Sequence, residues 1–412
     1  MGDTGSLCVV ESSETPHQTF LIQVDGPDKE GITTHVLGTL AAADAAIEDV
    51  EQIVIRNHIS LNIVAEIPDG RDLLKELLLV GYEHGLTIEF EPVEATPPRK
   101  PTGTIVTVLG QRLEAAELAA VTGVATAAGG NVDRVERLSK YPAWSYQMYI
   151  TGGDVQALRE GLVALRPQYP GMDVAIQPQG LPRRALRVVV LDVDRTLVQN
   201  EMIDELADLA GVGAEVAELT ERAMQGELDF EQALRSRVGL LAGQPESILD
   251  KGWDRLRLTP GAKTFISTLR HLGFKIAIVS GGFTSITDRL KAELGLDYAF
   301  ANTLEIVDGN LTGQVAGPIV DRERKAELLE LIAAEEGLAT RQIVAVGDGA
   351  NDVAMLEAAG LGIAFNAKRG VADAADAELN LPYLDAVLYM LGISREDIES
   401  EGSLTSSSPP EV

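Results

Sequence analysis

The sequence contains little cysteine, few aromatic residues and no long apolar run. Its 412 residues include one cysteine, Cys8, so no disulfide can form within the chain, and a cytoplasmic location is expected. Since no apolar stretch approaches the length of a membrane span, we expect no transmembrane helix. Aromatic residues make up 4% of the chain, so valine, leucine, isoleucine and alanine must fill the hydrophobic cores.

Positive charge is also scarce. The chain has 34 lysine and arginine residues against 63 acidic residues, a formal net charge of −29. Such a surface repels the phosphates of nucleic acids and anionic membranes, so we expect neither as a partner. A site for an anionic substrate would have to gather its positive charges locally.

The length and two proline-rich polar stretches predict several domains. Residues 94–103 and 176–184 are typical of linkers. The C-terminal stretch is acidic and rich in serine and proline, with too little apolar surface to fold. The predicted segments are domains at 17–95, 103–178 and 186–395, followed by a disordered tail at 396–412.

The first two segments look like copies of one another. Strand-like FLIQV (20–24) and TIVTV (104–108) begin the two copies, and acidic alternating strands follow at 47–55 and 131–139 with the same offset. Each copy has the order βαββαβ. This order predicts a ferredoxin-like sheet with helices on one face.

The turn GPDKEGI (26–32) resembles the ACT family of amino-acid-sensing domains. Asp28 and Gly31 fit the D-x-x-G-I/L turn of that family, where glycine lets backbone amides approach a ligand carboxylate. The resemblance implies an amino acid effector, such as L-serine, and a homodimer, because ACT domains commonly pair. The second copy has no matching residues at 109–115, which puts its ligand binding in doubt.

From residue 186 onward, apolar strands alternate with long helices, which indicates a parallel α/β sheet. Three of the strands end in polar clusters: VVVLDVDRT (188–196), KIAIVSGGF (275–283) and IVAVGDGAND (343–352). The carboxyl ends of parallel strands form the ligand-binding edge of such sheets. We therefore expect the three clusters to converge.

The residue types in these clusters suit phosphate chemistry. Asp192 and Asp194 leave a strand on the same side, and Asp348 adds a third carboxylate. A divalent cation such as Mg²⁺ would allow three carboxylates to share one pocket. An ionised Asp192 could attack phosphorus, and Asp194 could protonate the leaving oxygen and then activate water. Candidate phosphate donors are Ser280, Gly281, Gly282 and Lys325.

Together these motifs resemble the haloacid dehalogenase superfamily of phosphatases. Its signature D-x-D-x-T, S/T, K and G-D-x-x-N-D corresponds to residues 192–196, Ser280, Lys325 and 347–352. The resemblance implies a Rossmann-like domain with a small helical cap. It also implies Asp192 as the nucleophile and an Mg²⁺ held by the carboxylates predicted above.

Residues 186–395 further resemble the phosphoserine phosphatase family. The resemblance implies that Glu201 binds the substrate ammonium and Arg237 its carboxylate. A cap at about 200–258 would close the pocket through Met224 and Phe230. Supporting residues would be Asn351 for the phosphate, Asp352 behind the metal ligands and Thr196 in the nucleophile loop.

One position departs from that family, which has serine where this chain has Arg195. The side chain could point out of the pocket, change the substrate preference or product release, or reduce activity. The resemblance implies Mg²⁺-dependent hydrolysis of O-phospho-L-serine to L-serine and phosphate, the last step of serine biosynthesis, with amino acid regulation. The alternatives are a phosphatase for another small phosphomonoester, and an amino-acid-sensing protein with a weakened phosphatase domain.

Overall fold

The computed structural model describes residues 17–68, 71–93, 103–225 and 227–405. Cys8 and residues 406–412 lie outside the described part. The chain divides into two compact units, residues 1–100 and 101–412. None of the helices in the described ranges has both the length and the apolarity needed to cross a membrane.

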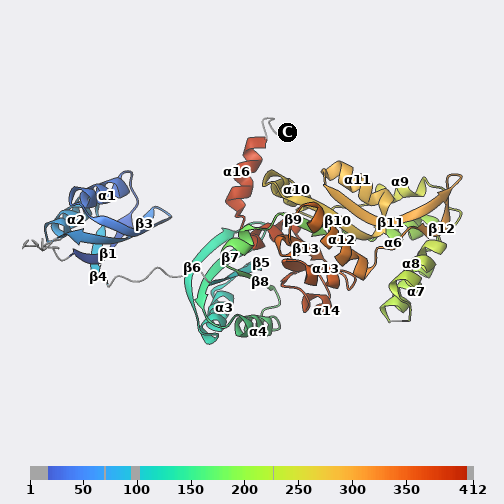
Figure 1. Ribbon diagram of the computed structural model, residues 1–412, viewed down its shortest axis with the longest axis horizontal. Coiled ribbons are helices and arrows are strands. Elements are labelled where there is room, and N and C mark those ends of the chain that lie inside the picture. The colour runs from blue at the N-terminus through green and yellow to red at the C-terminus, as the bar shows by residue number, and fades with distance from the viewer. Residues whose placement is uncertain (1–16, 69–70, 94–102, 226, 406–412) are drawn as a thin grey trace, which may run out of the picture. The chain divides into compact units, whose positions relative to one another are not determined.

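The first unit is an antiparallel sheet in the order β2-β3-β1-β4 with two helices, as Figure 1 shows. Along β3, buried residues such as Ile59, Leu61 and Ile63 alternate with less buried ones, as the sequence pattern predicts. These side chains pack against Val36 and Leu40 of α1. The elements are β1 (His17–Pro27), α1 (Ile32–Ala42), β2 (Ala46–Ile55), β3 (His58–Pro68), α2 (Arg71–His84) and β4 (Thr87–Pro92).

The second unit begins with a second copy of this fold, so the two predicted βαββαβ folds are confirmed. Its strands have the equivalent order β6-β7-β5-β8, and β8 then pairs with β15 of the following domain. One eleven-stranded sheet therefore runs through the whole unit. The elements of this copy are β5 (Gly103–Gly110), α3 (Ala115–Ala127), β6 (Gly130–Ser139), β7 (Trp144–Gly152), α4 (Val155–Leu165), β8 (Met172–Pro178) and α5 (Leu181–Arg184).

The catalytic part has parallel strands in the order β11-β10-β9-β13-β14-β15, with β12 antiparallel at the edge. Val188 and Val190 of β9 enter one core with α12, and Val189 and Leu191 enter the other with α10. The predicted Rossmann-like arrangement is confirmed. The strands are β9 (Val188–Leu191), β10 (Lys275–Phe283), β11 (Tyr298–Val307), β12 (Asn310–Ala316), β13 (Ile343–Gly347), β14 (Leu361–Phe365) and β15 (Ala377–Leu379).

Helices cover both faces of this sheet (Figure 1). Those after the cap are α10 (Ala262–His271), α11 (Thr284–Leu294), α12 (Arg322–Glu335), η1 (Thr340–Gln342), α13 (Val353–Ala358), α14 (Arg369–Ala372), η2 (Leu384–Ala386) and α15 (Val387–Met390). The stretch predicted as a cap contains α6 (Met202–Ala210), α7 (Gly213–Met224), α8 (Phe230–Gly239) and α9 (Ile248–Trp253).

The predicted disordered tail is wrong for its first residues, which form α16 (Arg395–Thr405). Ser394 and Asp397 bond each other at the start of this helix, and Arg395 pairs with Glu399 one turn later. Ile398 is buried in the catalytic core. Capping, an i,i+4 pair and one anchoring side chain compensate for the polar composition.

Polar contacts hold the second βαββαβ copy against the parallel part of the sheet. Asp173 on β8 accepts hydrogen bonds from Asn380 N at 2.8 Å and Asn380 Nδ2 at 2.9 Å. Gln177 Nε2 donates to the Met390 carbonyl at 2.7 Å. Burial raises the pKa of Asp173 to about 6. These contacts and the shared sheet join the two parts into one unit.

Candidate active site

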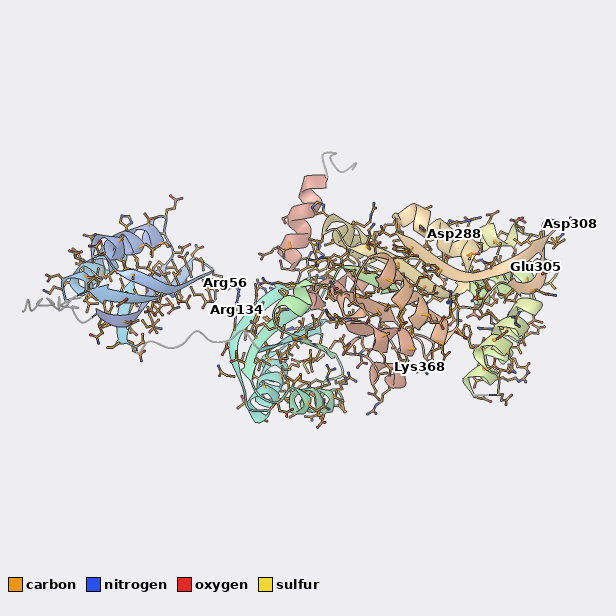
Figure 2. All side chains as sticks on the ribbon, in the orientation of Figure 1. Arg56, Arg134, Asp288, Glu305, Asp308 and Lys368 are labelled. Carbon is orange, nitrogen blue, oxygen red and sulfur yellow. The ribbon has the colours of Figure 1, made fainter. Side chains whose placement is uncertain are left out.

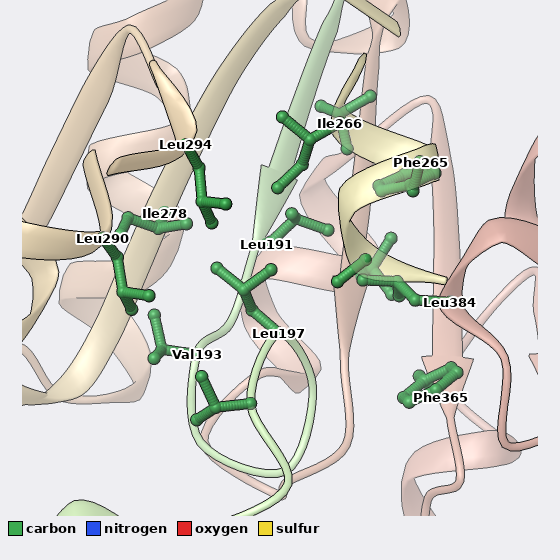
Figure 3. Close-up of a cluster of buried hydrophobic side chains, with 14 of the residues drawn as sticks. Leu191, Val193, Leu197, Phe265, Ile266, Ile278, Leu290, Leu294, Phe365 and Leu384 are labelled. Atoms are coloured by element: carbon green, nitrogen blue, oxygen red, sulfur yellow. The ribbon is translucent and has the colours of Figure 1, made fainter. Parts of the chain in front are cut away.

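The three predicted strand ends lie side by side. β9 is paired in parallel with β10 on one side and with β13 on the other. Leu191 and Val193 point into the hydrophobic core (Figure 3), which turns Asp192 and Asp194 toward the site. The carboxyl ends of the three strands therefore bring the predicted acids together.

Lys325 lies in the middle of these acids and is completely buried. Its ammonium donates to Asp192 Oδ1 at 2.7 Å and to Asp352 Oδ1 at 2.6 Å. Burial lowers the pKa of Lys325, but the two carboxylates outweigh burial and raise the pKa above its ordinary value. Lys325 therefore keeps its proton, and it fixes one Asp192 oxygen while leaving the other free to react.

The second acid of the motif faces a different set of partners. Asp194 Oδ1 accepts a hydrogen bond from Met202 N at 2.9 Å, and Oδ2 accepts one from Ser280 Oγ at 3.3 Å. A methyl group added at Gly282 would lie 2.9 Å from Asp194 Oδ2, so glycine is required for this close approach. Burial raises the pKa of Asp194, which favours the protonated form that a general acid needs.

Two residues that support this site escaped the sequence reasoning. Asn302, fully buried, donates to the Gly281 carbonyl at 2.8 Å and accepts from Val320 N at 2.8 Å. Thr259 donates to the Thr196 carbonyl at 2.7 Å. Asn302 ends the apolar run YAFAN on β11, and a polar residue at the end of such a run was the available signal.

Three carboxylates could hold a metal ion, because oxygens of Asp192, Asp348 and Asp352 lie within 4.8 Å of one another. Burial and the charge of Asp352 raise the pKa of Asp348 to about 7. They raise the pKa of Asp192 as well, against the opposing effect of Lys325. This all-oxygen cluster, with one ammonium for three carboxylates, fits a hard divalent cation.

Both oxygens of Asp352 accept hydrogen bonds within the protein, although they lie in this cluster. One oxygen accepts from Lys325, and the other accepts from Gly349 N at 2.9 Å. This arrangement agrees with the predicted supporting role of Asp352. The Asp194 carboxylate, predicted as a ligand, accepts hydrogen bonds from Met202 N and Ser280 Oγ, so metal binding by Asp194 stays a prediction.

The predicted phosphate and loop residues also gather here. Thr196 Oγ1 donates to Asp348 Oδ1 at 3.4 Å. A methyl group on Gly281 would lie 3.1 Å from Phe230 Cζ and 3.8 Å from Asn351 Nδ2. The cap residue Phe230 and Asn351 therefore both lie near Gly281, at the carboxyl end of β10.

The predicted substrate residues of the cap share one electrostatic environment. Burial raises the pKa of Glu201, while the charges of Arg195, Arg237 and Lys368 lower it. Lys368, labelled in Figure 2, immediately precedes α14. Arg237 Nε also donates to the Ala233 carbonyl at 3.3 Å. The side chain of Met224 lies outside the described part.

The predicted effector turn of the first unit has a defined backbone. Gly31 precedes α1 with φ of 87°, a left-handed conformation that favours glycine. Its carbonyl lies 2.7 Å from His35 Nδ1, and Asp28 N donates to the Asn57 carbonyl at 2.8 Å. Amino acid binding by Asp28 and Gly31 stays a prediction.

Comparison with known proteins agrees with this fold. Residues 189–357 match the haloacid dehalogenase-like hydrolases, and residues 18–91 and 102–177 match ACT domains. A structure of a probable phosphoserine phosphatase from Vibrio cholerae is 36% identical, with a TM-score of 0.54 over 73% of this chain and 89% of that chain. The fold and site thus define a haloacid dehalogenase-like hydrolase with two ACT domains.

Full-length relatives narrow the class further. The phosphoserine phosphatase of Streptomyces coelicolor is 47% identical over 96% of both chains. Phosphoserine phosphatase SerB2 of Mycobacterium tuberculosis is 43% identical over 93% of this chain and 95% of its own. The chain belongs to the phosphoserine phosphatase family.

Proposed function

We propose that this protein hydrolyses O-phospho-L-serine to L-serine and phosphate, the last step of serine biosynthesis, with Mg²⁺ as its cofactor. The observation that carries the proposal is the buried Asp192, held at one oxygen by Lys325 at the carboxyl end of β9. The full-length similarity to phosphoserine phosphatases supports the substrate.

The cap residues bind the amino acid part of the substrate. Glu201 pairs with the ammonium group, and the Arg237 guanidinium pairs with the carboxylate. Phe230 closes over the pocket and excludes water, and the same role stays a prediction for Met224. The phosphate accepts hydrogen bonds from Ser280, the amides of Gly281 and Gly282, Lys325 and Asn351.

Asp192 then attacks phosphorus with its free oxygen. The bond from phosphorus to the serine oxygen breaks as an aspartyl-phosphate forms, and Asp194 gives its proton to the leaving serine oxygen. Asp194 next takes a proton from a water molecule that attacks phosphorus. Phosphate leaves, and the Asp192 carboxylate is restored.

Asp192, Asp348 and Asp194 would hold the Mg²⁺ ion, with Asp352 behind them. When bound, the ion offsets the repulsion between the carboxylates and the phosphate. Burial, and then the charge of Asp352, raise the pKa of Asp348, so a bound cation would favour its ionised form.

The ACT domains would regulate this activity. We assign an amino acid effector, such as L-serine, to Asp28 and Gly31 in the first copy, and a homodimeric assembly to pairing of ACT domains. Catalysis and effector binding are coupled if both bias one domain arrangement. The acidic surface and lone cysteine suit a cytoplasmic enzyme without nucleic acid or membrane partners.

The test is phosphate release from O-phospho-L-serine after chelation and again after Mg²⁺ is restored. We expect activity only with the metal, and Asp192→Asn should lower kcat by at least about 1,000-fold. Asp288→Asn, at an exposed position of α11 labelled in Figure 2, is the control. Equal activity of Asp192→Asn and the wild type would refute the mechanism. A panel of small phosphomonoesters would decide the substrate.

A further inference from the structure

Arg195 directly follows Asp194 in the sequence and precedes Thr196. Its backbone has an uncommon conformation. Its φ is 58°, in the left-handed region that few residues other than glycine and asparagine adopt readily. The side chain is about half exposed, and its Nη2 lies 3.0 Å from Glu201 Oε1. The guanidinium therefore forms an ion pair with a predicted substrate residue of the cap.

Glu201 is placed to receive a charged partner. It is the residue before α6, but its carboxylate does not bond to the helix amides. Asp194 instead accepts the hydrogen bond from Met202 N at that end. The Glu201 side chain is 23% exposed, so an ionised carboxylate there is partly desolvated and gains from a cation beside it.

We propose that Arg195 is an internal counter-ion of Glu201 that takes the place of the substrate ammonium group, and so sets how strictly the enzyme requires that group. The inference rests on the proposed function, in which Glu201 binds the ammonium. A site that pairs a substrate group strictly rejects analogues without that group, because its own charge is left unpaired. With Arg195 3.0 Å away, Glu201 stays paired either way.

The counter-ion has two opposite effects on substrates. O-phospho-L-serine must displace the guanidinium from Glu201, which raises its KM. A phosphomonoester without the ammonium leaves the ion pair in place and loses less affinity. Specificity is the difference between the binding free energies of the two substrates. Arg195 therefore reduces the preference for O-phospho-L-serine over a substrate without the ammonium group. Because Arg195 is half exposed, we expect changes of about two- to five-fold.

The test compares O-phospho-L-serine with O-phospho-3-hydroxypropionate, which has hydrogen in place of the ammonium group. Arg195→Asn removes the charge with a residue that tolerates the left-handed backbone, and Arg195→Lys keeps the charge. We expect Arg195→Asn to lower KM for O-phospho-L-serine by about two- to five-fold and to raise the kcat/KM ratio of the two substrates. Arg195→Lys should stay near the wild type.

The decisive control repeats the comparison in a protein that carries Glu201→Gln. In that protein, adding Arg195→Asn should no longer change the kcat/KM ratio, because the carboxylate that Arg195 pairs with is gone. The ratio is measured on one protein sample, so a partly misfolded variant does not alter it. An unchanged or lower ratio in Arg195→Asn would overturn the inference. So would an equal effect with and without the Glu201 carboxylate.

The same comparison as dissociation constants separates this inference from the proposed function. Both ligands are titrated calorimetrically into Asp192→Asn with and without Arg195→Asn. Absence of turnover in the wild type would overturn the proposed function, whereas the ratio of the two dissociation constants still decides the role of Arg195. A stronger preference for O-phospho-L-serine in the protein that also carries Arg195→Asn supports the role of Arg195 as a counter-ion.

Discussion

Replacing Lys325 by methionine tests the reasoning about the centre of the site. The ammonium is completely buried and lies 2.7 Å from Asp192 and 2.6 Å from Asp352. Methionine keeps most of the volume but leaves two buried carboxylates without their cation. Removing one partner of a buried ion pair costs about 3–5 kcal/mol in the free energy of unfolding, and we expect a loss of that size near neutral pH.

The loss should depend on pH in a defined direction. Burial already raises the pKa of Asp192, and without the ammonium that pKa rises further, so protonation of Asp192 favours the folded variant as the pH falls. In the wild type Lys325 has a raised pKa, and its contribution is lost only at strongly alkaline pH. The difference between variant and wild type should therefore shrink as the pH falls below neutral.

Urea unfolding followed by tryptophan fluorescence provides the assay. Both tryptophans of the chain, Trp144 and Trp253, lie in the second unit, so the signal reports that unit. The matched control is Lys275→Met. The Lys275 ammonium lies 2.8 Å from Asp297 Oδ1, so its ion pair is about as short as those of Lys325, but Lys275 is exposed. Equal destabilisation by the two substitutions, or a loss independent of pH, would refute the reasoning.

Three further substitutions have expected outcomes. Gly282→Ala would push a methyl group to 2.9 Å from Asp194 Oδ2, so kcat/KM should fall about 100-fold in a phosphate-release assay, whereas Gly123→Ala, with open space around it, should leave activity unchanged. Asn302→Ala removes the hydrogen bonds to the buried Val320 N and the half-buried Gly281 carbonyl and should cost about 2–4 kcal/mol in urea unfolding; unchanged stability would contradict the role assigned to it. Burial raises the pKa of Asp173 to about 6, so the wild type should lose about 2–3 kcal/mol of stability from about pH 4 to about pH 6. Asp173→Asn should flatten that part of the stability curve, and an unaltered curve would disprove the assignment.

Periodicity and strand-end position made much of this fold predictable. The alternating pattern of β3 and the repeated βαββαβ order indicated the two ferredoxin-like domains. The apolar strands before Asp192, Ser280 and Asp348 lie together because carboxyl ends of neighbouring parallel strands meet at one edge. Residue types alone then indicated phosphate and metal chemistry.

Other features depend on contacts between residues far apart in the chain. Nothing in the run YAFAN indicates that Asn302 hydrogen-bonds both the Gly281 carbonyl of β10 and Val320 N. Arg195, which pairs with Glu201, has a left-handed backbone conformation in the turn after β9, and the sequence does not indicate that conformation. The helix α16 forms although its composition is polar, because Ile398 packs into the hydrophobic core. The residues of that core are distant in the sequence, so the local sequence does not predict this contact.

The pairing of β8 with β15 has a consequence for shortening the chain. A chain that starts at residue 103 keeps the eleven-stranded sheet complete. A chain that starts at residue 186 would uncover the edge of β15, where Ala377 and Leu379 are fully buried. Unpaired apolar edges are templates for aggregation. In this protein the second ACT domain therefore also protects the edge of the catalytic sheet.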